Sequence, residues 1–147
     1  MSAAVIHTLM FDAIIKTSQR VISLIEEMAN NGDALFNNFI HQTDIYVRLD
    51  VIEALMTDVK SHESSISPIL SKTVEISLKH LQKIVETIEN ELQNFKDEVE
   101  LYNLSYMSYI KSFDYTNRII ILRSHITTME SRLNTLITIL NIHGFKN

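Results

Sequence analysis

Histidines and carboxylates are the residues of this 147-residue chain best suited to metal chemistry. The six histidines are His7, His41, His62, His80, His125 and His143. A di-iron four-helix bundle places a glutamate three residues before a histidine, so that both ligands reach the same side of one helix. None of the six has such a glutamate, and His41 and Asp44, which are three residues apart, have no second pair to match them. We therefore expect no metal site.

Nucleophilic and phosphate-binding patterns are also missing from the sequence. The chain has no cysteine, which excludes a thiolate nucleophile, a thiolate metal ligand and a disulfide, and favours an intracellular setting. The two glycines, Gly32 and Gly144, form no Gly-rich loop before a helix, and no serine stands in a glycine elbow. We expect a protein that is not an enzyme, with no catalytic residue and no cofactor.

The elements that would carry any site are predicted to be helices. Hydrophobic residues make up 46% of the chain, and its two glycines and one proline are too few breaks for strands and turns. The clearest helix covers about 114–142, because its apolar residues recur every three or four positions and must be buried along one side. These residues are Ile119, Leu122, Ile126, Met129, Leu133, Leu136 and Leu140.

Three more helices are predicted upstream, at about 3–29, 33–60 and 68–101. Asp33 can cap the second, and Ser67 before Pro68 can begin the third. Their inner faces are predicted to hold Ile6, Met10, Ile14, Thr17, Val21, Leu24 and Met28; Leu35, Phe39, Thr43, Tyr46, Leu49, Ile52 and Met56; and Val74, Leu78, Leu81, Val85, Ile88, Leu92, Phe95 and Val99. The predicted fold is all-α: one domain, residues 1–147, forming an antiparallel up-down four-helix bundle.

A short aromatic-rich segment, about 102–113, separates the third predicted helix from the last. It contains Tyr102, Tyr106, Tyr109 and Phe113, with Leu104, Met107 and Ile110 between them. Two interpretations are open. The rings could close one end of the core, where large aromatic side chains pack well. Alternatively, they could form an exposed patch that binds a partner.

Charge and the N-terminal segment restrict the partners. A net charge of −5, spread along the chain, provides no basic stripe for nucleic acid and no general attraction to anionic lipid. Residues 1–15 are mostly apolar, but no basic residue precedes them as in a secretory signal, and Asp12, Lys16 and Arg20 interrupt a membrane span. This segment is either a buried bundle helix or a helix that is packed in one state and enters a bilayer in another.

Nearly the whole chain resembles the HeLo-type four-helix bundle, which is found at the N-terminus of fungal cell-death effectors and in the mixed lineage kinase domain-like protein of animals. Plant resistance proteins have a related coiled-coil bundle. The resemblance rests on the apolar first helix over 3–25, the turn Asn31-Gly32-Asp33, the Arg-Leu step within 45–49, and Lys111-Ser112-Phe113 before the last helix. The family usually carries tryptophan near positions 51–54 and 113, and this chain has no tryptophan.

The resemblance implies a membrane-permeabilising cell-death effector domain, cytoplasmic and recruited to the plasma membrane. Such a domain acts after self-association or after release by a regulatory domain or protein. Its first helix would enter lipid, with Lys16 and Arg20 at headgroup level and with these insertion residues: Val5, Ile6, Leu9, Met10, Phe11, Ile14 and Ile15.

The alternative to the effector domain is a non-catalytic scaffold for protein-protein interaction. It would bind another helix or a second copy through the outer grooves of the bundle or through the patch formed by Tyr102, Tyr106, Tyr109 and Phe113. Removing residues 1–15 would unfold such a scaffold, whereas it would only silence the effector domain. A purely structural role is a third possibility.

Overall fold

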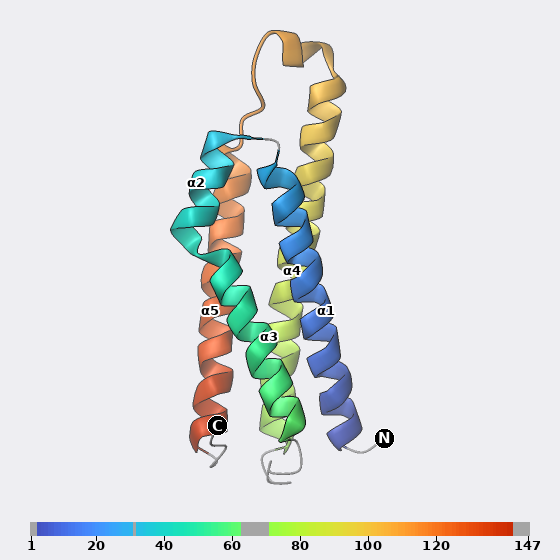
Figure 1. Ribbon diagram of the computed structural model, residues 1–147, viewed down its shortest axis with the longest axis vertical. Helices are drawn as coiled ribbons and strands as arrows, with labels where there is room; N and C mark the ends of the chain where they lie inside the picture. Colours follow the sequence, from blue (N-terminus) through green and yellow to red (C-terminus); the bar gives the residue numbers. More distant parts are fainter. Residues whose placement is uncertain (1–2, 31, 63–70, 143–147) are drawn as a thin grey trace.

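The computed structural model describes residues 3–30, 32–62 and 71–142, with side chains from His7 and Lys72 onward in the first and last of these ranges (Figure 1). Every regular element within these ranges is helical, so the all-α prediction is confirmed. The elements are α1 (Ala3–Ala29), α2 (Ala34–Thr43), α3 (Ile45–Ser61), α4 (Ser71–Leu104), the 3₁₀ helix η2 (Tyr106–Tyr109) and α5 (Thr116–Ile142).

Helical periodicity decides which side chains enter the core. Within α5, the buried residues are the seven that the sequence predicts. The eight predicted inner residues of α4, from Val74 to Val99, are all buried, and so are those of α1 from Met10 to Met28. The predicted inner residue Ile6 lies outside the described side chains. The prediction of apolar inner faces on α1, α4 and α5 is therefore confirmed.

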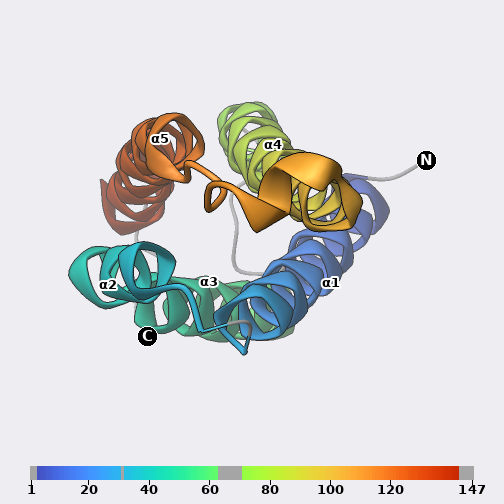
Figure 2. The same cartoon turned by 90° about the horizontal axis from the view of Figure 1, so that it is seen from above.

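The long helices pack side by side around this core. α1 makes its most extensive contacts with α4 and also packs on α3, whereas α5 packs mainly on α4 and less extensively on α2 and α3. Figure 2 looks along the helices and shows α1 and α5 on opposite sides of α4. α4 is thus the element that holds α1 and α5 in one structure.

Ion pairs show the relative direction of two neighbouring helices. Arg20 of α1 pairs with Glu89 of α4, and Glu27 of α1 pairs with Lys96 of α4. Both pairs join residues that are 69 positions apart, so α1 and α4 run in the same direction. The chain then turns back, and α5 runs alongside α4 in the opposite direction (Figure 1). Neighbouring helices are therefore not all antiparallel.

The prediction of one helix over about 33–60 is wrong, because the chain is interrupted at Asp44. This residue has φ 53° and ψ 34°, in the left-handed region that aspartate tolerates better than most residues. Carbonyls at the break find side-chain donors: Thr43 Oγ1 donates to the Phe39 carbonyl at 2.8 Å, and Arg48 Nε donates to the Thr43 carbonyl at 2.7 Å. Arg48 also pairs with Glu130 of α5. The break lets α3 pack mainly on α1, and α2 mainly on α5.

The turn before α2 follows the prediction. Gly32 has φ 76°, a left-handed conformation that glycine adopts without strain. Asp33 is the N-cap of α2, since its side chain accepts a hydrogen bond from the Phe36 N–H at 2.8 Å. Asn31 lies outside the described residues. Leu35, predicted to face inward, is exposed, and the next residue, Phe36, is buried in its place.

The ends of the last two long helices differ slightly from the prediction. α4 continues to Leu104 instead of ending near 101, and α5 begins at Thr116 instead of near 114. Asp114 precedes α5 and accepts a hydrogen bond from the Thr116 N–H at 3.0 Å. The predicted helix start at Ser67 and the stop near Gly144 lie outside the described residues.

Candidate functional site

The seven apolar residues predicted to insert into a bilayer do not share one exposed face of α1. Three of them, Met10, Phe11 and Ile14, are buried in the core, and Ile15 is half-buried against it. Leu9 is 55% exposed. The side chains of Val5 and Ile6 lie outside the described residues. Insertion of this helix would require all three buried residues to leave the core; the spacing of apolar residues predicts the burial of Met10 and Ile14 but not that of Phe11.

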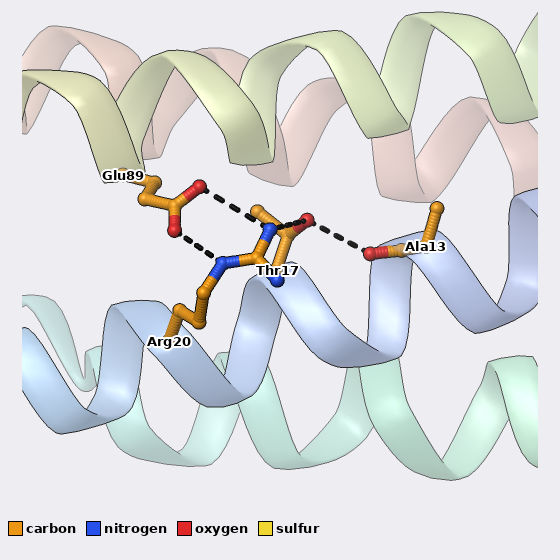
Figure 3. A network of polar contacts seen from close by, with 4 residues as sticks. All are labelled: Ala13, Thr17, Arg20 and Glu89. Atoms are coloured by element: carbon orange, nitrogen blue, oxygen red, sulfur yellow. Dashed lines mark hydrogen bonds and ion pairs between the residues drawn. The ribbon is translucent and has the colours of Figure 1, made fainter.

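The two basic residues predicted at headgroup level differ in their contacts. Lys16 is exposed. Arg20 lies between α1 and α4 (Figure 3), where its Nε donates to Glu89 Oε2 at 2.5 Å and its Nη2 donates to Thr17 Oγ1 at 3.1 Å. The hydrogen bond to Glu89 raises the pKa of Arg20 above its usual value. Thr17 in turn donates to the Ala13 carbonyl at 2.8 Å. Arg20 therefore holds α1 against α4.

The four aromatic residues of the predicted partner patch divide into two pairs. Tyr102 and Phe113 are half-buried and stack edge to face, with their ring centroids 5.5 Å apart. Phe113 also contacts Phe95, at 6.2 Å between centroids, and so closes this end of the core. Tyr106 and Tyr109 point away from that cluster, because 76% and 90% of their surfaces are exposed. Two of the four rings thus close the end of the core, and the other two are exposed to solvent.

The exposed pair belongs to a larger apolar surface at the end of α4. Its members come from the last turn of α4, from η2 and from the residue that follows η2, at one end of the molecule (Figure 1). Each is between 49% and 90% exposed. We call this surface the apolar tip and define it as Leu101, Leu104, Tyr106, Met107, Tyr109 and Ile110.

Hydrogen bonds within the segment hold the tip in shape. Ser105 Oγ donates to the Tyr102 carbonyl at 2.6 Å, and Ser108 Oγ donates to the Ser105 carbonyl at 2.8 Å. The Tyr102 hydroxyl donates to the Lys111 carbonyl at 2.5 Å, which ties the chain beyond η2 back to α4. Because Tyr102 is itself packed against Phe113, the tip rests on the closed end of the core.

Ion pairs join α4 to the adjoining helices near the tip. Arg118 of α5 pairs with Glu98 and Glu91 of α4, the latter at 3.4 Å. Lys96 pairs with Glu27 of α1 at 2.7 Å, and this hydrogen bond raises the pKa of Lys96. The acidic outer face of α4 is therefore neutralised only in part, since Arg118 is shared by two glutamates and Asp97 accepts a hydrogen bond from the neutral amide of Gln93.

Asp114, just beyond the tip, is held ionised by its local contacts. Hydrogen bonds from the backbone and side chain of Thr116, and more weakly the charge of Lys111, lower the pKa of Asp114. Asp114 therefore stabilises the start of α5. The six residues of the apolar tip include no carboxylate.

Elsewhere, two grooves flank α5. One lies between α3 and α5, has a volume of about 290 Å³ and is lined mainly by aliphatic residues, among them Val51, Leu55 and Ile137. The other lies between α4 and α5, has a similar volume of about 290 Å³ and includes His80 and Arg132. Neither set of lining residues brings a nucleophile and a base together with a group that would orient them.

Metal-ligating residues do not cluster in the part of the chain that the structure describes. Over residues 3–30, 32–62 and 71–142, no three His, Asp or Glu side chains lie where they could share a metal ion. His7 is buried, with its ring centroid 6.3 Å from that of Phe11. Among the same residues, no helix combines the length and the apolarity that a membrane crossing needs.

Sequence reasoning found part of the apolar tip and missed the rest. The predicted partner patch contains Tyr106 and Tyr109 of the tip but none of its non-aromatic residues, and Leu101 falls at the predicted end of the preceding helix. Leu101 is only two positions after the inner residue Val99, so it points outward, and its spacing was a signal that it would be exposed. Comparison with known proteins adds nothing to the assignment, since no family model, curated protein or solved structure matches the chain.

Proposed function

We propose that this chain is an up-down four-helix bundle, with α2 and α3 together as its second rod, and that it acts as a non-catalytic interaction domain. It binds through the apolar tip. One observation carries this proposal: six large apolar side chains are exposed together at one end of the molecule, although folding has buried the apolar faces of every long helix. Contiguous apolar surface that a domain leaves in water commonly marks the place where it binds.

Site-specific photocrosslinking of the full chain tests this function. The photoreactive residue p-benzoylphenylalanine replaces either Tyr109 in the tip or Ile142, a similarly exposed apolar residue at the far end of α5. In cells that express the protein, position 109 should give adducts, either to a discrete protein or to membrane lipid, that Leu104→Ser with Ile110→Ser removes, and position 142 should not. Identical patterns at the two positions, or adducts that survive the double substitution, would refute docking through the tip.

A second candidate function is the one that the resemblance to HeLo domains implies, in which α1 leaves the bundle and permeabilises a membrane. Two observations favour it. Leu9 is exposed, and the ion pair between Asp12 and Lys60 of α3, at 2.8 Å, is about 40% exposed on both sides, so water can replace it at little cost. Against it stands the burial of Phe11 and Ile14, whose contacts would have to be exchanged for lipid.

Leakage from liposomes tests the second candidate. The wild-type chain, brought together by a fused oligomerising domain, should release an entrapped dye, and Leu9→Glu should reduce the release while Ile142→Glu leaves it unchanged. A wild-type chain that releases no dye under any oligomerising condition excludes this function. Circular dichroism of a chain without residues 1–15 completes the comparison, because an interaction domain that needs α1 in its core will unfold.

A further inference from the structure

We propose that the apolar tip is a membrane-surface anchor that enters the interfacial layer of a lipid bilayer end-on while the helical bundle stays folded. This inference rests on the proposed function, since it names the partner of the same tip. It differs from insertion of α1 in that no buried residue has to move. The four observations that carry it are the composition of the tip, its hydrogen bonding, its charge and its size.

The composition of the tip suits the boundary between lipid headgroups and acyl chains. Leu104 and Ile110 offer aliphatic side chains, and Tyr106 and Tyr109 combine an apolar ring with a hydroxyl that can stay hydrated. Tyrosine is enriched at this level of membranes for that reason. Lys111, exposed directly after the tip, can reach phosphate groups while its methylene stem stays among apolar atoms.

The backbone of the tip is prepared for a medium with little water. A peptide group that enters lipid without a hydrogen-bond partner is strongly unfavourable. Here the Lys111 N–H donates to the Met107 carbonyl at 3.0 Å, and the Ser108 N–H donates to the Ser105 carbonyl at 3.3 Å. The hydroxyls of Ser105, Ser108 and Tyr102 donate to the carbonyls of residues 102, 103 and 111, respectively. The tip can thus leave water with many of its polar groups already paired.

The charge around the tip offers no attraction to an anionic bilayer and no obstacle to a neutral one. Glu98 is paired with Arg118, and Glu100 lies 3.8 Å from Lys96, whereas Asp97 accepts a hydrogen bond from the neutral Gln93, so the last turns of α4 keep some negative charge. Lys111 is the only charged residue between 101 and 113. Binding should therefore follow apolar area, with little dependence on anionic lipid or on salt.

The size and position of the tip favour a lipid surface over a protein partner. A stable protein interface engages about 20–30 residues on each side, and the tip offers six. Two tips meeting end to end would engage only these six residues on each side. A bilayer, in contrast, needs no matching shape and accepts a few anchoring side chains. Because the tip lies at one end of the long axis (Figure 1), it can dip into the membrane without bringing the sides of the bundle into contact with lipid.

A tryptophan reporter tests the anchor, because the chain contains no tryptophan of its own. Tyr109→Trp places the reporter in the tip, and Ile142→Trp places it at a similarly exposed position at the other end. On titration with phosphatidylcholine vesicles, the emission of the tip reporter should shift to shorter wavelength, and brominated acyl chains should quench it. The reporter at 142 should show neither change, and added sodium chloride or phosphatidylserine should alter the tip response less than about twofold.

Paired variants in the Tyr109→Trp chain identify the residues that carry binding. Leu104→Glu with Ile110→Glu should lower the vesicle partition coefficient at least about tenfold, and the control, Ile76→Glu with Ile142→Glu, should not. Vesicle binding that is absent, or that the control lowers equally, overturns the anchor. A spectral shift without lipid that grows with protein concentration also overturns it and makes a second copy the occupant of the tip. In that case docking through the tip stands, so the two proposals fail separately.

Discussion

Replacing Phe11 by alanine measures how firmly α1 belongs to the core. The ring is fully buried, so truncation removes its contacts and leaves a cavity that the surrounding long helices can fill only in part. Such substitutions cost about 3–5 kcal/mol, a large part of the roughly 5–15 kcal/mol that stabilises a typical domain. Leu9→Ala, two residues away on the exposed side of the same helix, should change stability by less than about 0.5 kcal/mol.

Urea denaturation followed by far-ultraviolet circular dichroism gives both free energies of unfolding. A loss of less than about 1 kcal/mol for Phe11→Ala would refute the conclusion that α1 is an integral core helix. It would also mean that α1 can leave the core at a low free-energy cost, which would favour the second candidate function. The expected large loss would instead mean that α1 can leave only if lipid replaces most of the contacts made by Phe11, Ile14 and Met10.

The remaining predictions concern helix ends and one half-buried glutamate. Asp33→Ala removes the N-cap of α2 and should cost about 1 kcal/mol in the same denaturation experiment. At the left-handed position 44, Asp44→Ala should be less stable than Asp44→Gly by about 1 kcal/mol, because alanine is strained there; equal stabilities would contradict that reason. Burial, and then the charge of Asp50, raises the pKa of Glu53, whose Oε1 has no hydrogen-bond partner among the described residues. The folded state therefore holds this proton more tightly, and stability falls as pH rises above about 4.3. Glu53→Gln should accordingly raise the free energy of unfolding at neutral pH, but not below the pKa that Glu53 has in the unfolded chain. A stabilisation that does not depend on pH would show that the carboxylate charge is not its cause.

Much of the fold could be predicted because one physical pattern dominates the chain. Apolar residues spaced three and four apart fix the buried side of a helix whatever it packs against. For that reason the inner faces of α4 and α5 follow from the sequence from Val74 to Leu140. The cap at Asp33 was equally readable, since an aspartate after a glycine turn satisfies the first amides of a helix.

That pattern could not predict the helix break at Asp44 or which helices pack against one another. The sequence around Thr43-Asp44-Ile45 contains neither glycine nor proline, and its helical periodicity continues across the break. The left-handed residue is supported by Arg48, whose partners lie on two other segments and become visible only in three dimensions. Similarly, the parallel packing of α1 on α4 brings together pairs such as Arg20 with Glu89, which helical spacing cannot identify.

The candidate site was predicted in outline only. An aromatic-rich stretch between two helices signals either a plug or a patch, and deciding between them requires knowing where the core ends. The core ends at Phe95, because Phe113 contacts the Phe95 ring and is itself half-buried. Tyr109 lies beyond the reach of this cluster and stays in water.

The contacts of Arg48 have a consequence for how the folded molecule opens. One guanidinium serves both the last carbonyl of α2 and a carboxylate in the middle of α5. Movement of either segment away from Arg48 of α3 breaks one of the two contacts of this side chain, so we expect the two segments to open together with α3. In native-state hydrogen–deuterium exchange, amides near Thr43 and Glu130 should then exchange at similar rates, although 86 residues separate them along the chain in α3, α4 and their connections. Arg48→Met should let the two sets of rates diverge, with α2 exchanging first because it is the shorter helix.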